Sequence, residues 1–150
     1  TSGTYIPALK QKGFSVLTEA TPARAATGIV DKKTLLAKNS ETGENIMQAL
    51  MEGEYYVMAP GNKSRVVKTI MTKLKLSDSS LAEEGYADVI KEFEPKPYPP
   101  LEGLKNMQRL LALQNPRLAD INPATLMDTT FMRRLEESGF IAQLQARYRE

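Results

Sequence analysis

Apolar side chains recur every three or four residues through most of the chain after residue 32, with polar side chains between them. This spacing predicts amphipathic helices. The clearest case is Ser64–Leu76, where one face carries only apolar residues and lysines lie around the other (Val66, Val67, Ile70, Met71, Leu74). Similar patterns, most of them closed by Pro, Gly or Asn, predict the remaining helices: Tyr5–Lys12, Lys32–Lys38, Asn45–Ala59, Ser77–Phe93, Leu101–Leu113 and one that begins at Asp128 or Thr129.

Two short segments near the start have a different pattern. Phe14–Thr18 alternates apolar and polar residues in part, and Thr27–Val30 is a short run that includes Ile and Val. Both are rich in residues that favour strands, so we predict a strand at each. At the other end, Gly139 is expected to close a helix, and Ile141–Glu150 is predicted to be a polar tail that is either helical or frayed. The fold class predicted is therefore α/β, mostly helical in this segment.

A proline-rich strap interrupts the helices at Pro95–Pro100, where four of six residues are proline. Proline lacks a backbone donor and fixes φ, and it also pushes the residue before it towards extended geometry. We therefore predict a stiff, extended connection between two amphipathic helices. We expect it to act as a structural tether with no chemistry of its own.

Composition excludes several classes of function. The 150 residues are 41% hydrophobic, and the net charge is only +2, with both signs interleaved, so nothing in the overall charge points to nucleic acid or to an anionic membrane. There is no cysteine and no histidine, so the chain lacks the commonest metal ligands and the commonest acid–base group at neutral pH. We expect no enzyme activity, no cofactor and no metal.

Most candidate sites have simpler explanations. The acidic pairs Glu83-Glu84 and Glu136-Glu137 lie on polar helix faces, where solvated charge is usual. Pro60–Ser64 lacks the spacing of a phosphate-binding loop. The methionines are expected to fill the core, and the arginines at 133–134 and 147–149 are too few for a nucleic-acid interface.

The remaining candidate is the hydroxyl-rich start of the chain, where Ser2, Thr4 and Tyr5 precede a predicted helix. The free N–H groups of a first helical turn can bind an anion. If a strand precedes residue 1, these residues also lie where open α/β sheets bind ligands. The alternative is an ordinary helix-capping cluster.

The order of motifs resembles one family. Gly3–Lys10 and Lys12–Leu17 look like a segment of the periplasmic solute-binding proteins of ABC importers, in the nitrate/sulfonate/taurine and thiamine-precursor-like group. The likeness continues through Leu101–Leu104, Leu110–Pro116 and Phe131–Phe140. It covers most of the chain, and the order of the motifs is more specific than any one of them.

This resemblance implies the C-terminal half of a two-lobed, type II periplasmic-binding-protein fold. Residues 1–19 would end the second lobe, 20–31 would form a hinge crossing, and 32–150 would be helical return segments of the first lobe, including the strap. The two lobes would close on a small polar or anionic solute, and a permease in the inner membrane would recognise the closed form. The resemblance further implies a periplasmic or cell-surface location.

The sequence has no signal peptide and no start methionine, so we expect a mature chain or a piece of a longer one. A piece would expose apolar surface and tend to self-associate. The main alternative function is a stand-alone helical adaptor that holds a partner protein. A third, an enzyme of thiamine-precursor synthesis, ranks last because such chemistry normally uses histidine.

Overall fold

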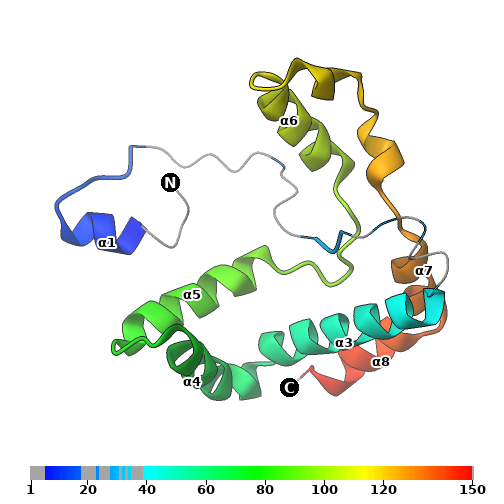
Figure 1. Cartoon of the computed structure of the whole chain (residues 1–150). Helices are drawn as coiled ribbons and strands as arrows, with labels where there is room; N and C mark the ends of the chain where they lie inside the picture. Colours follow the sequence, from blue (N-terminus) through cyan, green and yellow to red (C-terminus); the bar gives the residue numbers. More distant parts are fainter. Residues whose placement is uncertain are drawn as a thin grey trace. The chain divides into compact units, whose positions relative to one another are not determined.

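The computed structural model describes residues 6–17, 23, 28–30, 32, 34 and 39–149, and for Ile6–Ala8 it describes the backbone only. The described chain is mostly helical, as predicted, and Figure 1 shows helices α3 to α8 following one another along the chain. The α-helices are α1 (Ile6–Gln11), α3 (Ser40–Met58), α4 (Lys63–Leu74), α5 (Ser79–Glu92), α6 (Leu101–Ala112), α7 (Thr130–Glu137) and α8 (Phe140–Arg147). Three short 3-10 turns lie between them: η2 (Pro60–Asn62), η3 (Pro116–Asp120) and η4 (Pro123–Leu126).

The described residues fall into two compact units. The first takes its residues from Thr1–Glu19, Leu50–Pro95 and Ile141–Glu150, and the second from Ala20–Ala49 and Lys96–Phe140. The boundary crosses α3 between residues 49 and 50 and cuts the strap after Pro95. The predicted divisions at residues 19 and 31 fall largely outside the described residues, so they stay predictions.

In the first unit, α4 and α5 form a helical hairpin around a small apolar core. Its buried members come from both helices: Val66, Val67, Ala82 and Tyr86. Ile70, Met71, Leu76 and Ile90 pack around them, together with Tyr56 and Val57 of α3. The turn between the helices is fixed at both ends. Lys75 takes a left-handed conformation (φ 53°) and donates its backbone N–H to Met71 O, while the Asp78 carboxylate accepts from the Ser80 N–H at 2.8 Å.

The second half of α3 and helix α8 complete the first unit. Met51 and Tyr55 of α3 are buried, as are Ile141 and Leu144 of α8. The Arg147 guanidinium donates to the Glu52 carboxylate at 2.6 Å, which joins the two helices at the surface. The predicted tail Ile141–Glu150 is therefore helical over most of its length, one of the two states expected for it, and it is not polar on every side. Its apolar positions are few but lie at helical spacing, and they are enough to bury one face.

In the second unit, α6 folds back on the 3-10 turns η3 and η4 through its Gln108 side chain, which donates to the carbonyls of Leu118 (2.6 Å), Ala119 (3.4 Å) and Ile121. Helix α7 begins where predicted, because the Asp128 carboxylate accepts from the Thr130 N–H at 2.8 Å.

Gly43 and Gly139 have contacts or conformations that favour glycine. A Cβ on Gly43, in the second unit, would lie 2.7 Å from Phe131 Cζ, so only glycine leaves room for that ring. Gly139 ends α7 with φ 79°, as expected for a residue after a helix.

The strand predictions are wrong where the structure tests them. Phe14–Leu17 and Gly28–Val30 belong to no strand, and no strand occurs elsewhere in the described chain. A strand needs a neighbour to pair with, and these short segments have none among the described residues. Leu17 is 97% exposed and Val30 is 93% exposed, as expected for segments without a packed partner.

Helix boundaries agree with the predictions to within a few residues, with one exception: α3 begins at Ser40 rather than Asn45. Pro95–Pro100 is free of helix, as its prolines require. The predicted helix Lys32–Lys38 and the hinge segment lie mainly outside the described residues. No helix in the described part of the chain combines the length and apolar character that a membrane crossing requires.

Candidate functional site

The predicted ligand-binding residues Ser2, Thr4 and Tyr5 all lie outside the described residues, so their role stays a prediction. The helix that follows them is present: α1 runs from Ile6 to Gln11. Gly13, two residues after its end, has a φ of 84°. Its position agrees with the predicted helix Tyr5–Lys12.

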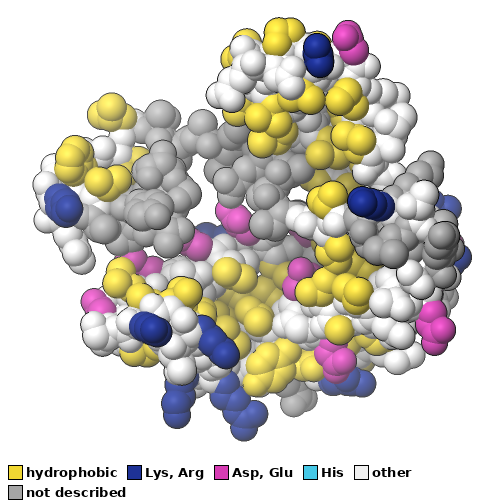
Figure 2. All heavy atoms as spheres, in the orientation of Figure 1, with side chains coloured by type: hydrophobic (Ala, Val, Ile, Leu, Met, Phe, Trp, Pro, Cys, Tyr) yellow, Lys and Arg dark blue, Asp and Glu magenta, His cyan; other side chains and the backbone are white. Residues whose placement is uncertain are grey.

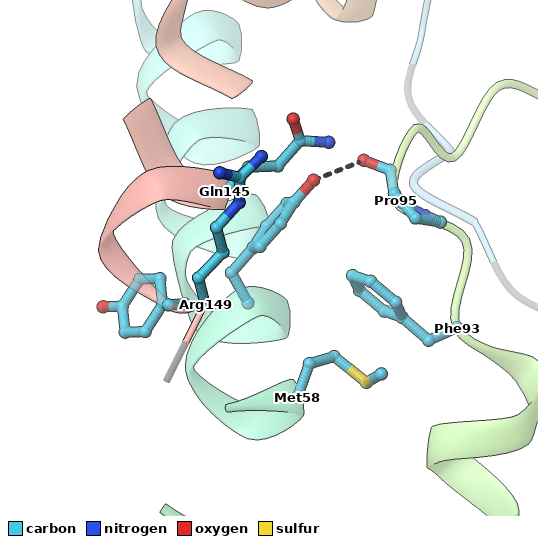
Figure 3. A pocket seen from close by; sticks show the side chains of 7 residues that line it. Met58, Phe93, Pro95, Gln145 and Arg149 are labelled. Atoms are coloured by element: carbon cyan, nitrogen blue, oxygen red, sulfur yellow. Dashed lines mark hydrogen bonds between the residues drawn. The ribbon is translucent and has the colours of Figure 1, made fainter. Parts of the chain in front are cut away.

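A pocket of about 340 Å³ opens in the first unit, where α3, α8 and the start of the strap meet. Most of its lining side chains are aromatic or apolar, and two, Gln145 and Arg149, are polar. The full lining is Tyr55, Met58, Phe93, Pro95, Gln145, Tyr148 and Arg149. Figure 3 shows Phe93 and Pro95 on one side of it and Gln145 and Arg149 on the other. Its volume is at the lower end of the range for small-molecule sites.

Tyr55 forms the fixed wall of this pocket. It is only 6% exposed, and its hydroxyl donates to the Pro95 carbonyl at 3.0 Å. Its ring meets the Phe93 ring edge to face, with centroids 5.5 Å apart and planes at 87°. Such pairs are favourable beyond the area they bury. Tyr55 thus attaches the first proline of the strap to helix α3.

The opposite wall comes from α8 and the residues after it. The Tyr148 ring packs edge to face on Tyr56, with centroids 6.3 Å apart, and its hydroxyl reaches Glu52 at 3.5 Å. Arg149 is exposed at the edge of the pocket. No residue of the lining is a carboxylate or a histidine, so the pocket has no acid–base pair. Its apolar side chains equip it to bind the apolar part of a ligand beside the Arg149 cation.

A second polar cluster holds the strap within the other unit. The Glu136 carboxylate of α7 accepts from the Lys96 ammonium and from the Tyr98 hydroxyl, the latter at 2.7 Å. These two hydrogen bonds lower the pKa of Glu136, and the same hydrogen bond to Glu136 raises the pKa of Tyr98. The two partners are separated from Glu136 by 40 and 38 residues in sequence, so no local pattern could have revealed the cluster.

The two acidic pairs named in the sequence differ in their surroundings. Glu83 and Glu84 are exposed, as expected for a solvated helix face, with Glu83 paired to Lys63 at 3.4 Å. Glu136 is different, because it fastens the strap and is not simply solvated. Among the described residues, no group of three or more potential ligands is arranged to hold a metal ion.

The comparisons with known proteins add no family to this picture. No family model matches the chain, and neither the curated proteins nor the solved structures include a match.

Proposed function

We propose that the chain is the C-terminal portion of the solute-binding component of an ABC importer, of the nitrate/sulfonate/taurine and thiamine-precursor-like kind. The support from sequence is the order of motifs from Gly3 to Phe140, which runs through most of the chain. The support from structure is coarser. The helices after residue 39 follow one another as the proposed return segments would, with a non-helical strap between α5 and α6.

The observation that carries the proposal is the number of large apolar side chains left uncovered on amphipathic helices. Ile46 of α3 is 48% exposed, and on α6 Leu110 is 60% and Leu111 43% exposed. Helices of an α/β lobe bury such side chains against a sheet. The proposal assigns that sheet to residues that precede Thr1, and the exposed side chains are the surface that it would cover.

In this proposal binding is non-covalent. Two lobes close on a small polar or anionic solute, and the permease selects the closed form, so the free energy comes from tighter binding to the closed state. Ser2, Thr4 and Tyr5 would supply hydroxyl groups and the N-terminus of α1 to the solute. No cofactor takes part.

Calorimetry on the full-length protein tests these residues, with nitrate, taurine and a thiamine-precursor pyrimidine as probes. We expect Thr4→Ala and Tyr5→Phe each to weaken binding of the accepted probe about tenfold, the effect of one lost hydrogen bond to a polar ligand. Ser64→Ala, which changes an exposed hydroxyl at the start of α4, is the matched control. Unchanged affinity in both test variants would remove these residues from the pocket.

A helical protein-interaction adaptor is the second candidate, and one observation favours it: the described residues contain no strand. In that case the pocket beside Pro95 would receive part of a partner protein. The coding sequence upstream of Thr1 separates the two functions. An in-frame extension that encodes strands and a signal peptide excludes the adaptor, whereas a true start near Thr1 excludes the solute-binding protein.

Sedimentation gives an independent measure. The solute-binding proposal leaves the α6 leucines without their cover, so the chain alone is expected to self-associate. If sedimentation shows a monomer at high protein concentration, the result would favour the self-contained adaptor over the solute-binding protein.

A further inference from the structure

The pocket beside Pro95 combines an apolar wall with a single cation. Side chains of α3 and of the segment from Phe93 to Pro95 supply the apolar part of its lining, and Gln145 and Arg149 supply the polar part. All of these residues belong to the first unit. Figure 3 shows Gln145 and Arg149 across the pocket from Phe93, so a ligand in the space between them meets one polar side and one apolar side.

The positive charge of Arg149 is not neutralised by the pocket itself. No ion pair joins its guanidinium to any residue that the structure describes. The Glu52 carboxylate, which the Tyr148 hydroxyl reaches at 3.5 Å, already accepts from Arg147 at 2.6 Å. Because that carboxylate is used by Arg147 and the lining contains no other, the charge at the edge of the pocket is open to an external anion.

The neutral polar groups of the lining are few. Gln145 is half-buried, and its amide forms no hydrogen bond within the described part of the chain. The Tyr55 hydroxyl, in contrast, already donates to the Pro95 carbonyl at 3.0 Å. A bound peptide would bring a donor and an acceptor with every peptide unit, and each needs a partner when it is buried. A small acid brings one charged group, which Arg149 and Gln145 can satisfy between them.

Arg149 differs in its surroundings from the cations of an open helix face. Figure 2 shows dark blue Lys and Arg side chains gathered at the place that α4 occupies in Figure 1, where an ion pair in water adds little binding free energy. Beside Arg149 the ligand also gains contact with an apolar wall. That wall is already fixed, because Tyr55 is 6% exposed and meets the Phe93 ring edge to face. A preformed wall lowers the entropy lost on binding.

From these observations we propose that the pocket binds a small amphipathic carboxylate, with its apolar body against Met58 and Phe93 and its carboxylate on Arg149 and Gln145. A guanidinium matches a carboxylate through two parallel hydrogen bonds. One cation balances one carboxylate, whereas a phosphate group, with about 1.5–2 negative charges, would keep part of its charge unmatched. The volume of about 340 Å³ suits a body the size of an aromatic ring or a short branched chain.

This site is separate in its residues from the proposed function. It uses neither the hydroxyl groups of Ser2 and Thr4 nor that of Tyr5. Failure of the pocket to bind an acid would therefore leave the solute-binding proposal unchanged, and loss of the solute site would leave the pocket unchanged.

NMR titration of the whole chain with 3-phenylpropionate tests the proposal. The Met58 methyl signal is expected to shift, whereas that of Met107, on α6 in the other unit, is expected not to. We expect a dissociation constant of about 1–5 mM, as for a ligand of roughly ten non-hydrogen atoms. Two comparison ligands separate charge from apolar contact. 3-Phenylpropanamide has the ring without the charge and propionate the charge without the ring, and each should bind about tenfold more weakly.

Variants then assign the charge to one residue. Arg149→Gln is expected to weaken binding of 3-phenylpropionate about tenfold and to leave binding of the neutral amide unchanged. Arg117→Gln removes an exposed arginine from the other unit, so it changes the net charge equally and should alter binding by less than about twofold. Gln145→Glu keeps the shape of the side chain but places a carboxylate beside the ligand, and it should weaken binding of the acid at least about tenfold. Unchanged binding of the amide shows that each variant is folded.

Four results would overturn the proposal. The first is an equal effect of Arg149→Gln and Arg117→Gln, which would reduce the attraction to net charge. The second is equal binding of the acid and its amide by the unchanged chain. The third is a titration in which the Met58 methyl does not shift. The fourth is tighter binding of the uncharged N-acetylphenylalaninamide than of the acid, which would assign the pocket to a partner protein.

Discussion

The α4–α5 hairpin and the hook formed by α6, η3 and η4 are built from similar amphipathic sequence but are held together differently. In the hairpin, apolar residues from both helices are buried together, with Ala82 fully covered and Tyr86 only 7% exposed. In the hook, one polar side chain, Gln108, connects α6 to the carbonyls of the return segment. The hook leaves Leu110 60% exposed and Leu113 82% exposed.

The difference indicates which part of the chain needs a further surface. A helix that buries its apolar stripe on its neighbour has used the main source of its stability. The hook has closed its turns but has left Leu110, Leu111 and Leu113 exposed, so part of the hydrophobic free energy available to it is unused. This is the physical basis for assigning the α6 face to a sheet that the described residues do not contain.

The largest expected effect comes from the hairpin core. Tyr86→Ala removes a buried ring and should lower the free energy of unfolding by about 3 kcal/mol or more. Leu110→Ala, the matched change in the hook, should alter it by less than about 0.5 kcal/mol, because that side chain is already exposed. Urea unfolding followed by far-UV circular dichroism measures both, and equal effects would abolish the contrast.

The same pair of variants can be made in a longer chain that includes the residues preceding Thr1. If these supply the sheet, Leu110→Ala becomes a buried truncation and should cost about 2 kcal/mol or more. A cost that stays below about 0.5 kcal/mol would contradict the proposed cover for α6.

The next effect concerns the closure of the hook. Gln108→Ala removes the donor to three carbonyls and should cost about 1 kcal/mol locally. The Ile121 amide, which donates to Leu118 O at 3.3 Å, should then exchange its hydrogen about five- to tenfold faster. Gln114→Ala changes an exposed glutamine just after α6 and is the control. Unchanged exchange at Ile121 would show that the turns close without Gln108.

The sequence predicted the helices well, because amphipathic spacing and Pro, Gly or Asp end signals are local. The Asp128 and Gly139 boundaries are examples. It failed at Phe14–Leu17, where strand-forming residues suggest a strand but only a partner can make one. It left open whether Ile141–Glu150 is helical or frayed, because Ile141 and Leu144 are too few to dominate a polar segment, although both are buried in the structure.

Sites were harder to predict than helices, for the same reason. Glu136 and the pocket beside Tyr55 depend on residues about 40 positions apart. The lysines around α4 were visible in the sequence, but the pairing of Lys63 with Glu83 of α5, 20 residues away, was not. Nothing in one sequence states which charges will be paired.

A smaller effect tests the turn that closes the hairpin. Lys75→Gly should stabilise the chain by about 0.5–1 kcal/mol, because glycine adopts a φ of 53° without the strain that it costs lysine. Lys73→Gly removes the same charge inside α4 and should destabilise by about 1 kcal/mol. Thermal unfolding of the two variants should therefore shift in opposite directions.

The smallest effect is expected at the strap, where the fastening is polar and exposed and so responds to pH. The pKa of Glu136 is lowered in the folded chain, so its contribution is present above the unfolded pKa near 4.5 and is lost as pH falls through the folded value. The pKa of Tyr98 is raised from 10.0, so its contribution is lost only as pH rises through the higher folded value. NMR titration should find the Tyr98 ring signals changing as Glu136 titrates at acid pH. Glu136→Gln should remove that change, whereas Glu137→Gln, next along α7, should preserve it. If both variants keep it, the strap is held by its prolines and not by Glu136, and the hook alone would depend on a polar side chain for its closure.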